Sequence, residues 1–252
     1  MKEKIYTIPV NEAYDKDCEC PLCELEKQLE YEAVEYALGA AMMEPDFRIE
    51  SNEKGYCNRH FKQMFDAHNK LSLALVLETH LIELRKKLDG LEKAVNTAAA
   101  GKSGLFKRNT AAETAAEDIS AVFGKVECEC MICQKINSTT KHYIDVLLYL
   151  WATEEEFRAK FERSKGVCLK HFKILCEAAP KHIKSDAGKF IAALAAKEKK
   201  ELERIQEDIH RFTLKFDYRY NDMEWGTAQD APLRTIEKIS GYITPYDDKE
   251  KN

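Results

Sequence analysis

The sequence has 252 residues, which is enough for one large domain or two smaller ones with their own cores. Its formal net charge of −5 excludes nucleic acid as the expected partner, because binding to phosphates requires a basic surface. With only 10 Gly and 6 Pro, the composition favours long helices over a turn-rich β fold.

Residues 1–20 contain no apolar core of the kind that a secretory signal needs. The most apolar run, 143–152, is too short to cross a bilayer and includes Asp145. We therefore expect a cytoplasmic protein that does not associate with membranes. Because thiols stay reduced in the cytoplasm, the nine clustered cysteines favour metal ligands over disulfides.

In chain order, the first motif that carries chemistry is CECPLC at residues 18–23, and a helix is expected to follow it. A second motif, Cys57-x2-His60, opens another expected helix. Residues 77–95 then carry apolar side chains three and four residues apart, which predicts a long helix packed on other helices as in a bundle. This stripe consists of Leu77, Leu81, Leu84, Leu88, Leu91 and Val95.

The same order returns in the second half of the chain. CECMIC at 128–133 precedes an expected helix, and the motif Cys168-x2-His171 precedes a long helix that reaches Phe216. The three-cysteine motifs align at an offset of 110 residues, and the Cys-x2-His motifs align at 111. A match at several separated points with one single-residue gap indicates a tandem duplication.

The predicted fold is all-α, a tandem-duplicated helical bundle in which each half has a Cys/His metal site at helix ends. The first repeat half covers residues 1–96, and the second covers 119–216. Between them, 97–118 is rich in Ala, Thr, Gly and Lys and is expected to be a linker that is partly helical or mobile. The remainder, 217–252, is predicted to be a C-terminal docking segment and tail.

Residues 216–242 mix aromatic and charged side chains without a regular period. Pro232 near the start and Gly241 at the end frame a short helix that carries Leu233, Ile236 and Ile239. We expect this segment to dock on the bundle, or alternatively to form a recognition or ligand-binding strip. The final residues, 247–252, are expected to be disordered.

Each half offers two ligand pairs at metal-site spacing. Two residues between ligands let both side chains turn onto one ion, as in structural zinc sites. A Cys and a His three residues apart share a face on the first turn of a helix, where the N-terminus favours thiolate. Grouping the ligands within each half predicts Cys20, Cys23, Cys57 and His60 for one site, and Cys130, Cys133, Cys168 and His171 for the other.

Zinc is the expected metal, with two ions per chain. Cys18 and Cys128 are surplus thiols, and they are possible additional ligands. They would also complete all-cysteine sets for iron–sulfur clusters, which are the alternative cofactor.

The motifs CPLC (20–23), KGYCNRHF (54–61), KGVCLKHF (165–172) and FDYRYNDMEWG (216–226) together resemble an uncharacterised bacterial family, known as a domain of unknown function. The family pattern centres on C-P-x-C and C-x2-H without requiring the leading cysteine, which implies the ligand set given above. The chain departs from this pattern at Met131, which stands in place of the proline, so the second site is expected to have a looser turn. The resemblance implies a fold and a metal, but no activity.

These observations favour a zinc-stabilised helical scaffold that binds an unknown protein or small ligand, and an enzyme is not favoured. One alternative is a redox or metal-handling protein with iron–sulfur or labile zinc–thiolate sites. A less favoured alternative is a zinc hydrolase, with Asp222 or Glu224 as the base. The sequence does not identify the partner or the oligomeric state.

Overall fold

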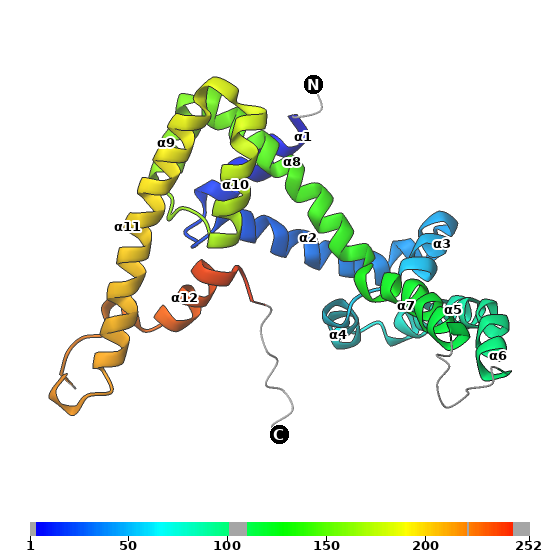
Figure 1. Ribbon diagram of the computed structural model, residues 1–252. Coiled ribbons are helices and arrows are strands. Elements are labelled where there is room, and N and C mark those ends of the chain that lie inside the picture. Colours follow the sequence, from blue (N-terminus) through cyan, green and yellow to red (C-terminus); the bar gives the residue numbers. More distant parts are fainter. Residues whose placement is uncertain (1–3, 101–109, 221, 244–252) are drawn as a thin grey trace. The chain divides into compact units, whose positions relative to one another are not determined.

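The computed structural model describes residues 4–100, 110–220 and 222–243, and every regular element in these ranges is a helix (Figure 1). The predicted all-α fold class is therefore confirmed. Within the same ranges, no helix has the length and apolarity that a bilayer-spanning segment requires. Two parts of the predictions, the centre of the linker at 101–109 and the tail at 247–252, lie outside the described residues.

The chain forms two compact units whose bounds differ from those of the predicted repeat halves. Unit 1 contains Met1–Gln28 and Ser138–Asn252, and unit 2 contains Leu29–Asn137. The boundary falls within two helices, α2 (Pro21–Leu38) and α8 (Met131–Thr153), so each of them contributes residues to both units. As a result, each unit combines sequence from the first half with sequence from the second.

Unit 2 is built from the end of α2, the start of α8 and the helices between them. These are η1 (Ala40–Met43), α3 (Pro45–Lys54), α4 (Asn58–Asp66), α5 (Lys70–Gly90), α6 (Glu92–Ala100) and α7 (Thr110–Cys128). Helix α3 packs on α5, and α6 packs on α7. The described ends of the predicted linker are helical, because they belong to α6 and α7. Leu38, Met64 and Val76 lie in the core of this unit, together with Cys130 and Ile132 at the start of α8.

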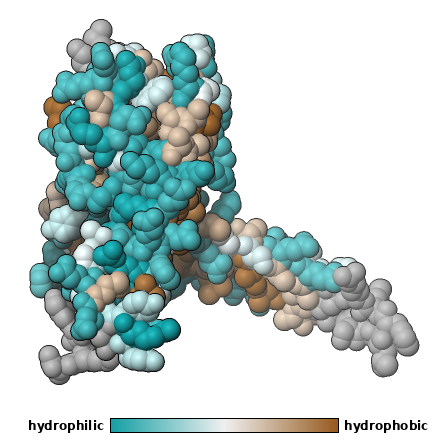
Figure 2. Space-filling model, turned by 90° about the vertical axis from the view of Figure 1, so that its left-hand side faces the viewer, coloured by the Kyte–Doolittle hydropathy of each residue, from teal (hydrophilic) through white to brown (hydrophobic). Residues whose placement is uncertain are grey.

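The leucine stripe of α5 does not form the buried face that its spacing predicted. Leu73, Val76 and His80 are the buried residues of α5, which packs on α3 through this face. Leu77, Leu81 and Leu88 are 38%, 58% and 54% exposed. The face drawn in Figure 2, which is the left-hand side of Figure 1, is mostly hydrophilic with brown hydrophobic patches between. Most of residues 77–95 are helical, but the single predicted helix is divided at Leu91 into α5 and α6, and its apolar stripe lies largely in water.

Unit 1 is built from the remaining helices. These are α1 (Lys4–Asp15), the start of α2, most of α8, α9 (Glu155–Arg163), α10 (Leu169–His182), η2 (Lys184–Asp186), α11 (Ala187–Leu214), η3 (Tyr218–Tyr220), η4 (Gly226–Ala228) and α12 (Ala231–Ser240). Aromatic side chains dominate its core. Trp151 and Phe161 both contact Phe190, and Tyr14 contacts Phe157 with ring centroids 5.0 Å apart. Such ring pairs add to the stabilisation that burial of their surface already gives.

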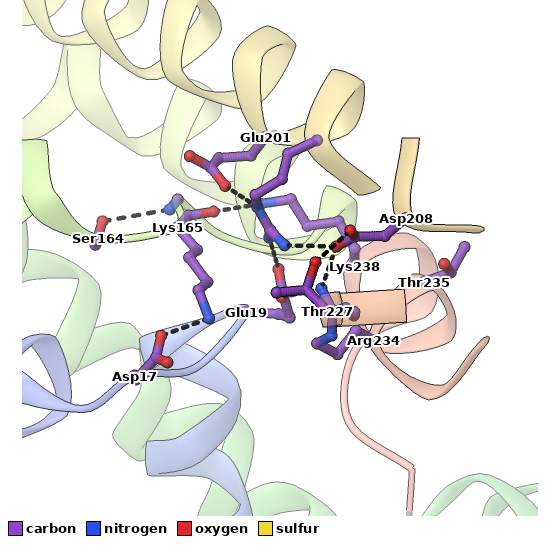
Figure 3. A network of polar contacts seen from close by, with 12 residues as sticks. Asp17, Glu19, Ser164, Lys165, Glu201, Asp208, Thr227, Arg234, Thr235 and Lys238 are labelled. Carbon is purple, nitrogen blue, oxygen red and sulfur yellow. Dashed lines mark hydrogen bonds and ion pairs between the residues drawn. The ribbon is translucent and has the colours of Figure 1, made fainter. Parts of the chain in front are cut away.

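Helix α12 buries charged side chains and exposes apolar ones. Lys238 is fully buried and lies 2.8 Å from Glu198 of α11. Arg234 lies 2.9 Å from Asp208 of the same helix (Figure 3). The apolar stripe of α12 faces water, with Leu233, Ile236 and Ile239 each 45–56% exposed. Ion pairs with α11 therefore orient α12, because a buried lysine is tolerated only beside a partner charge.

We predict that Lys238→Met lowers the free energy of unfolding by about 3–5 kcal/mol, because it leaves the Glu198 carboxylate buried without its cation. Equilibrium urea unfolding followed by helical circular dichroism measures the change. The double variant Lys238→Met with Glu198→Gln should recover much of the loss, since the buried charge is then removed.

Lys189→Met is the matched control, because the Lys189 side chain is 78% exposed in its ion pair with Asp186. Its effect should stay within about 0.5 kcal/mol. Equal effects of the two lysine substitutions would contradict the role assigned to the buried pair.

Candidate metal centres

Eight of the predicted ligands come together in two clusters. Centre 1 contains Cys20, Cys23, Cys168 and His171, and all four side chains are buried. Centre 2 contains Cys57, His60, Cys130 and Cys133, of which His60 and Cys130 are buried while Cys57 and Cys133 are half-buried. In each centre the three sulfurs and one nitrogen lie within 4.8 Å of one another, so each set could bind one metal ion.

The predicted grouping of ligands within each half is wrong. Cys20 and Cys23 lie with Cys168 and His171, and Cys130 and Cys133 lie with Cys57 and His60. The prediction assumed that the chain between two motifs runs out and returns. Helix α2 has 18 residues and rises ~27 Å, whereas α3 has only 10 residues and rises ~15 Å, so it cannot bring the chain back. Each Cys-x2-Cys motif is therefore completed by the Cys-x2-His motif of the other half.

Every ligand motif stands at the N-terminus of a helix. Cys168 is the N-cap of α10 and Cys57 is the N-cap of α4, so the histidine three residues later lies on the first turn, as predicted. Cys20 and Cys130 directly precede α2 and α8, and their carbonyls accept the first backbone hydrogen bonds of those helices. Two helix N-termini thus meet at each centre, and their partial positive charge favours the thiolate form of the cysteines.

Two glycines allow the chain to turn into the Cys-x2-His motifs. Gly55 and Gly166 have φ angles of 67° and 76°, a region that side chains with a Cβ rarely adopt. A Cβ on Gly166 would lie 2.2 Å from a carboxylate oxygen of Glu198, and one on Gly55 would lie 2.6 Å from the ring of His80. The glycine two residues before each cysteine is therefore required by the backbone and by the space around it.

Met131 replaces the proline of the first motif and gives centre 2 a contact that centre 1 cannot make. The backbone N–H of Met131 donates to the carbonyl of Gly55 at 3.2 Å. Pro21, at the corresponding place in centre 1, has no N–H to donate. The expected loosening of this turn is thus opposed by a hydrogen bond between the two chain segments that supply the ligands of centre 2.

The distances between ligand atoms are close to those of a tetrahedral zinc site. The Nδ1 atom of His171 lies 3.2–3.5 Å from the sulfurs of centre 1, and that of His60 lies 3.1–3.5 Å from the sulfurs of centre 2. The Cys23–Cys168 and Cys57–Cys133 sulfurs are 3.6 and 3.8 Å apart. Zinc with three sulfurs and one nitrogen places its ligand atoms ~3.6–3.8 Å apart.

The second nitrogen of each histidine faces a buried carboxylate of α2. Nε2 of His60 lies 2.9 Å from Glu30, and Nε2 of His171 lies 3.2 Å from Glu26. Such a carboxylate fixes the tautomer and direction of a metal-binding imidazole. Sequence analysis missed both residues. The available signal was a pair of glutamates four residues apart on a helix whose other residues on that face are apolar.

The histidine and cysteine pKa values show how the centres hold charge. Burial lowers the pKa of His171, but Cys168, Cys23 and Glu26 outweigh it and raise the pKa to about 11. In the same way, Cys130 and Glu30 raise the pKa of His60 to about 9. Burial raises the pKa of Cys130, but the hydrogen bond with His60 and those from backbone groups lower it to about 6. Burial and the neighbouring Cys130 raise the pKa of Cys133 to about 12, so a proton shared with His60 does not ionise every thiol of centre 2. A bound metal ion would favour the thiolate form of all three cysteines by displacing their protons.

Centre 1 has an outer layer of buried charge. Glu19, between two cysteines of the first motif, accepts a hydrogen bond from Arg204 at 2.5 Å and lies 3.5 Å from Arg234 (Figure 3). On the other ligand segment, the N–H of Val167 donates to Glu198 at 2.6 Å, and Lys238 donates to the carbonyl of Lys165 at 2.7 Å. Helices α11 and α12 therefore fix both chain segments that supply the ligands of centre 1.

The end of α12 also covers the metal ligands. A Cβ on Gly241, which has a φ of 93°, would lie 3.6 Å from the sulfur of Cys23 and 3.8 Å from that of Cys168. The surplus thiols lie outside both clusters. Cys18 is half-buried, and Cys128 is exposed at the end of α7.

A model of the family of unknown function DUF6062 matches residues 1–245, which include both centres and α12. No curated protein and no solved structure matches the chain. The match covers nearly the whole sequence and agrees with the resemblance drawn from its cysteine motifs and C-terminal segment. The chain therefore belongs to DUF6062, a family of unknown function whose member here has two buried Cys/His clusters.

Proposed function

We propose that the protein is a cytoplasmic zinc-stabilised helical scaffold, with one structural zinc ion in each centre. The observation that carries this proposal is the presence of two compact sets of three cysteine sulfurs and one histidine nitrogen, each at a junction of helix N-termini. Sites of this type contribute directly to folding, with apparent binding energies of about 10–16 kcal/mol in small zinc modules. The function of the metal is thus to fix the positions of the helices.

The closed ligand sets argue against a zinc hydrolase. Four protein ligands fill the tetrahedral positions of zinc and leave no place for an activated water molecule. Asp222 and Glu224, the residues considered as a base, are exposed and belong to neither cluster. The histidine in each set also favours zinc over an iron–sulfur cluster, which is usually bound by cysteines alone. Cys18 and Cys128, which would supply the fourth thiolate, lie outside the clusters.

The two halves are proposed to be duplicates that exchange their ligand motifs. Each centre takes a Cys-x2-Cys motif from one half and a Cys-x2-His motif from the other. In this arrangement neither half can form a complete centre by itself. The exposed leucines of α5 support a binding role for the scaffold, since soluble proteins rarely leave a row of large apolar side chains in water without a partner.

We expect protein purified without added metal to contain two zinc ions per chain and to be colourless. Elemental analysis and a visible spectrum, recorded after aerobic and anaerobic purification, check this. Replacement of zinc by cobalt should give the intense absorption bands of tetrahedral cobalt bound to thiolates. Iron with broad visible absorption would contradict the proposal and favour the iron–sulfur alternative.

The exchanged grouping predicts which pairs of substitutions remove the same ion. Cys20→Ser and Cys168→Ser should each lose one zinc, and combining them should still lose only that one, because both ligands belong to centre 1. Combining Cys20→Ser with Cys57→Ser should lose both ions. Zinc content of the purified variants is the measurement.

Grouping within the halves would give the opposite result for these two double variants. Cys57→Ser should also reduce solubility and the free energy of unfolding, because the site is structural. A Cys57→Ser protein that stays as stable as the parent and keeps two ions would contradict the structural role proposed for the zinc ion. Cys128→Ser, which changes an exposed thiol outside the clusters, serves as the control.

Glu26→Gln and Glu30→Gln should each weaken the affinity for one of the two zinc ions by roughly 10–100-fold, because each removes the carboxylate that orients a histidine ligand. Competition with a zinc chelator measures the affinity. Glu35→Gln, at an exposed position on the same helix, should leave both affinities unchanged. Equal effects at positions 26, 30 and 35 would show that the carboxylates do not act on the ligands.

A further inference from the structure

The two centres differ in how deeply their ligand residues are buried. All ligands of centre 1 are buried, and Cys168 is completely buried. In centre 2 the residues Cys57 and Cys133 are only half-buried, so this centre is less completely enclosed than centre 1. The same metal chemistry is thus placed in two environments, one closed and one open.

The difference follows from what packs on each centre. Centre 1 is fixed by the buried charges of α11 and α12, and Gly241 at the end of α12 lies against its sulfurs. In centre 2, His80 of α5 packs against Gly55, and Lys87 donates to the carbonyl of Glu53 at 2.9 Å. These contacts support the turn before Cys57 but leave Cys57 and Cys133 partly open.

The two half-buried cysteines are also neighbours. The sulfurs of Cys57 and Cys133 lie 3.8 Å apart, and a disulfide requires ~2.05 Å. Cys57 is the N-cap of α4 and Cys133 lies on the first turn of α8, and a disulfide between them requires the two sulfurs to move ~1.8 Å closer. Such a bond would connect the same two helix N-termini that the metal connects.

We propose that centre 2 is an oxidation site, at which a peroxide converts Cys57 and Cys133 into a disulfide and releases the metal ion while centre 1 keeps its own. This inference rests on the proposed function, since it assumes that zinc occupies both centres. It assigns the two sites different roles. Centre 1 is a permanent structural site, and centre 2 is one whose occupancy depends on the oxidants present.

The chemistry balances with hydrogen peroxide as the oxidant. The thiolate sulfur of one cysteine attacks a peroxide oxygen, the O–O bond breaks, and the products are a sulfenic acid and hydroxide. The second thiolate then attacks the sulfenic sulfur, the S–S bond forms, and hydroxide leaves. The two hydroxide ions take up two protons to give water. Two sulfurs are oxidised, one peroxide is reduced, and the zinc ion is released because it has lost two of its four ligands.

The full-length zinc protein is the sample for the test, and its zinc content is measured first. Hydrogen peroxide is then added in steps in the presence of a chromogenic zinc chelator, under conditions that keep the protein folded. We expect one zinc per chain to be released. Peptide mass spectrometry after alkylation should find a bond between Cys57 and Cys133, with Cys20, Cys23 and Cys168 still reduced. Dithiothreitol and added zinc should restore two ions.

Cys128→Ser provides the matched control, because it removes the exposed thiol near centre 2 without removing a ligand. It should release the same single ion and form the same bond. Release of both ions together, release of neither, or a bond from Cys128 to a ligand would each overturn the inference and leave the proposed function standing. Protein that contains no zinc before peroxide is added would overturn the proposed function, and this inference with it.

Discussion

Two helix N-termini meet at each Cys/His centre, and this arrangement is unfavourable without negative charge between them. Each N-terminus carries about half a positive charge, so facing ends repel. Three thiolates from α2 and α10, or from α8 and α4, supply the required negative charge. With one zinc ion the four ligands still have a net charge of −1, and a glutamate of α2 adds to it. The positions of all four helices therefore depend on the centres.

The residues of the two clusters could be predicted from the sequence because a metal site leaves a local signature in residue type and spacing. Cys and His residues spaced three apart at the start of a helix match the ligand spacing of zinc sites, and this spacing occurs twice for each motif type. The partner of each motif could not be identified in this way. Which motifs lie together depends on the lengths of α2 and α8. An apolar period predicts a helix but not the residue at which that helix ends. The length of α2 relative to α3 decides the grouping.

Buried charges were the other feature that the sequence concealed. In α12 the spacing of Leu233, Ile236 and Ile239 favours a helix that buries these three apolar side chains. In the structure they are exposed, and Lys238 and Arg234 of the same helix face α11. The acidic residues that pair with these two, Glu198 and Asp208, are on α11 and appear in the sequence as an ordinary solvated surface. A hydrophobic period predicts that a segment is helical. It does not predict which face of the helix is buried when ion pairs to another helix outweigh the burial of a few apolar side chains.

The exchange of ligand motifs also makes the two centres nested along the chain. Cys23 and Cys168 are 145 residues apart, and within that span His60 and Cys130 are 70 residues apart. Closing the inner loop roughly halves the length of chain that must be closed for the outer one, which lowers its entropic cost by ~0.6 kcal/mol. The inner centre also has all of its ligands by residue 133, whereas the outer one needs His171 and the covering helix that ends before Gly241. Assembly during synthesis is therefore ordered from the inside of the chain outward, and the more exposed centre is the one that forms first.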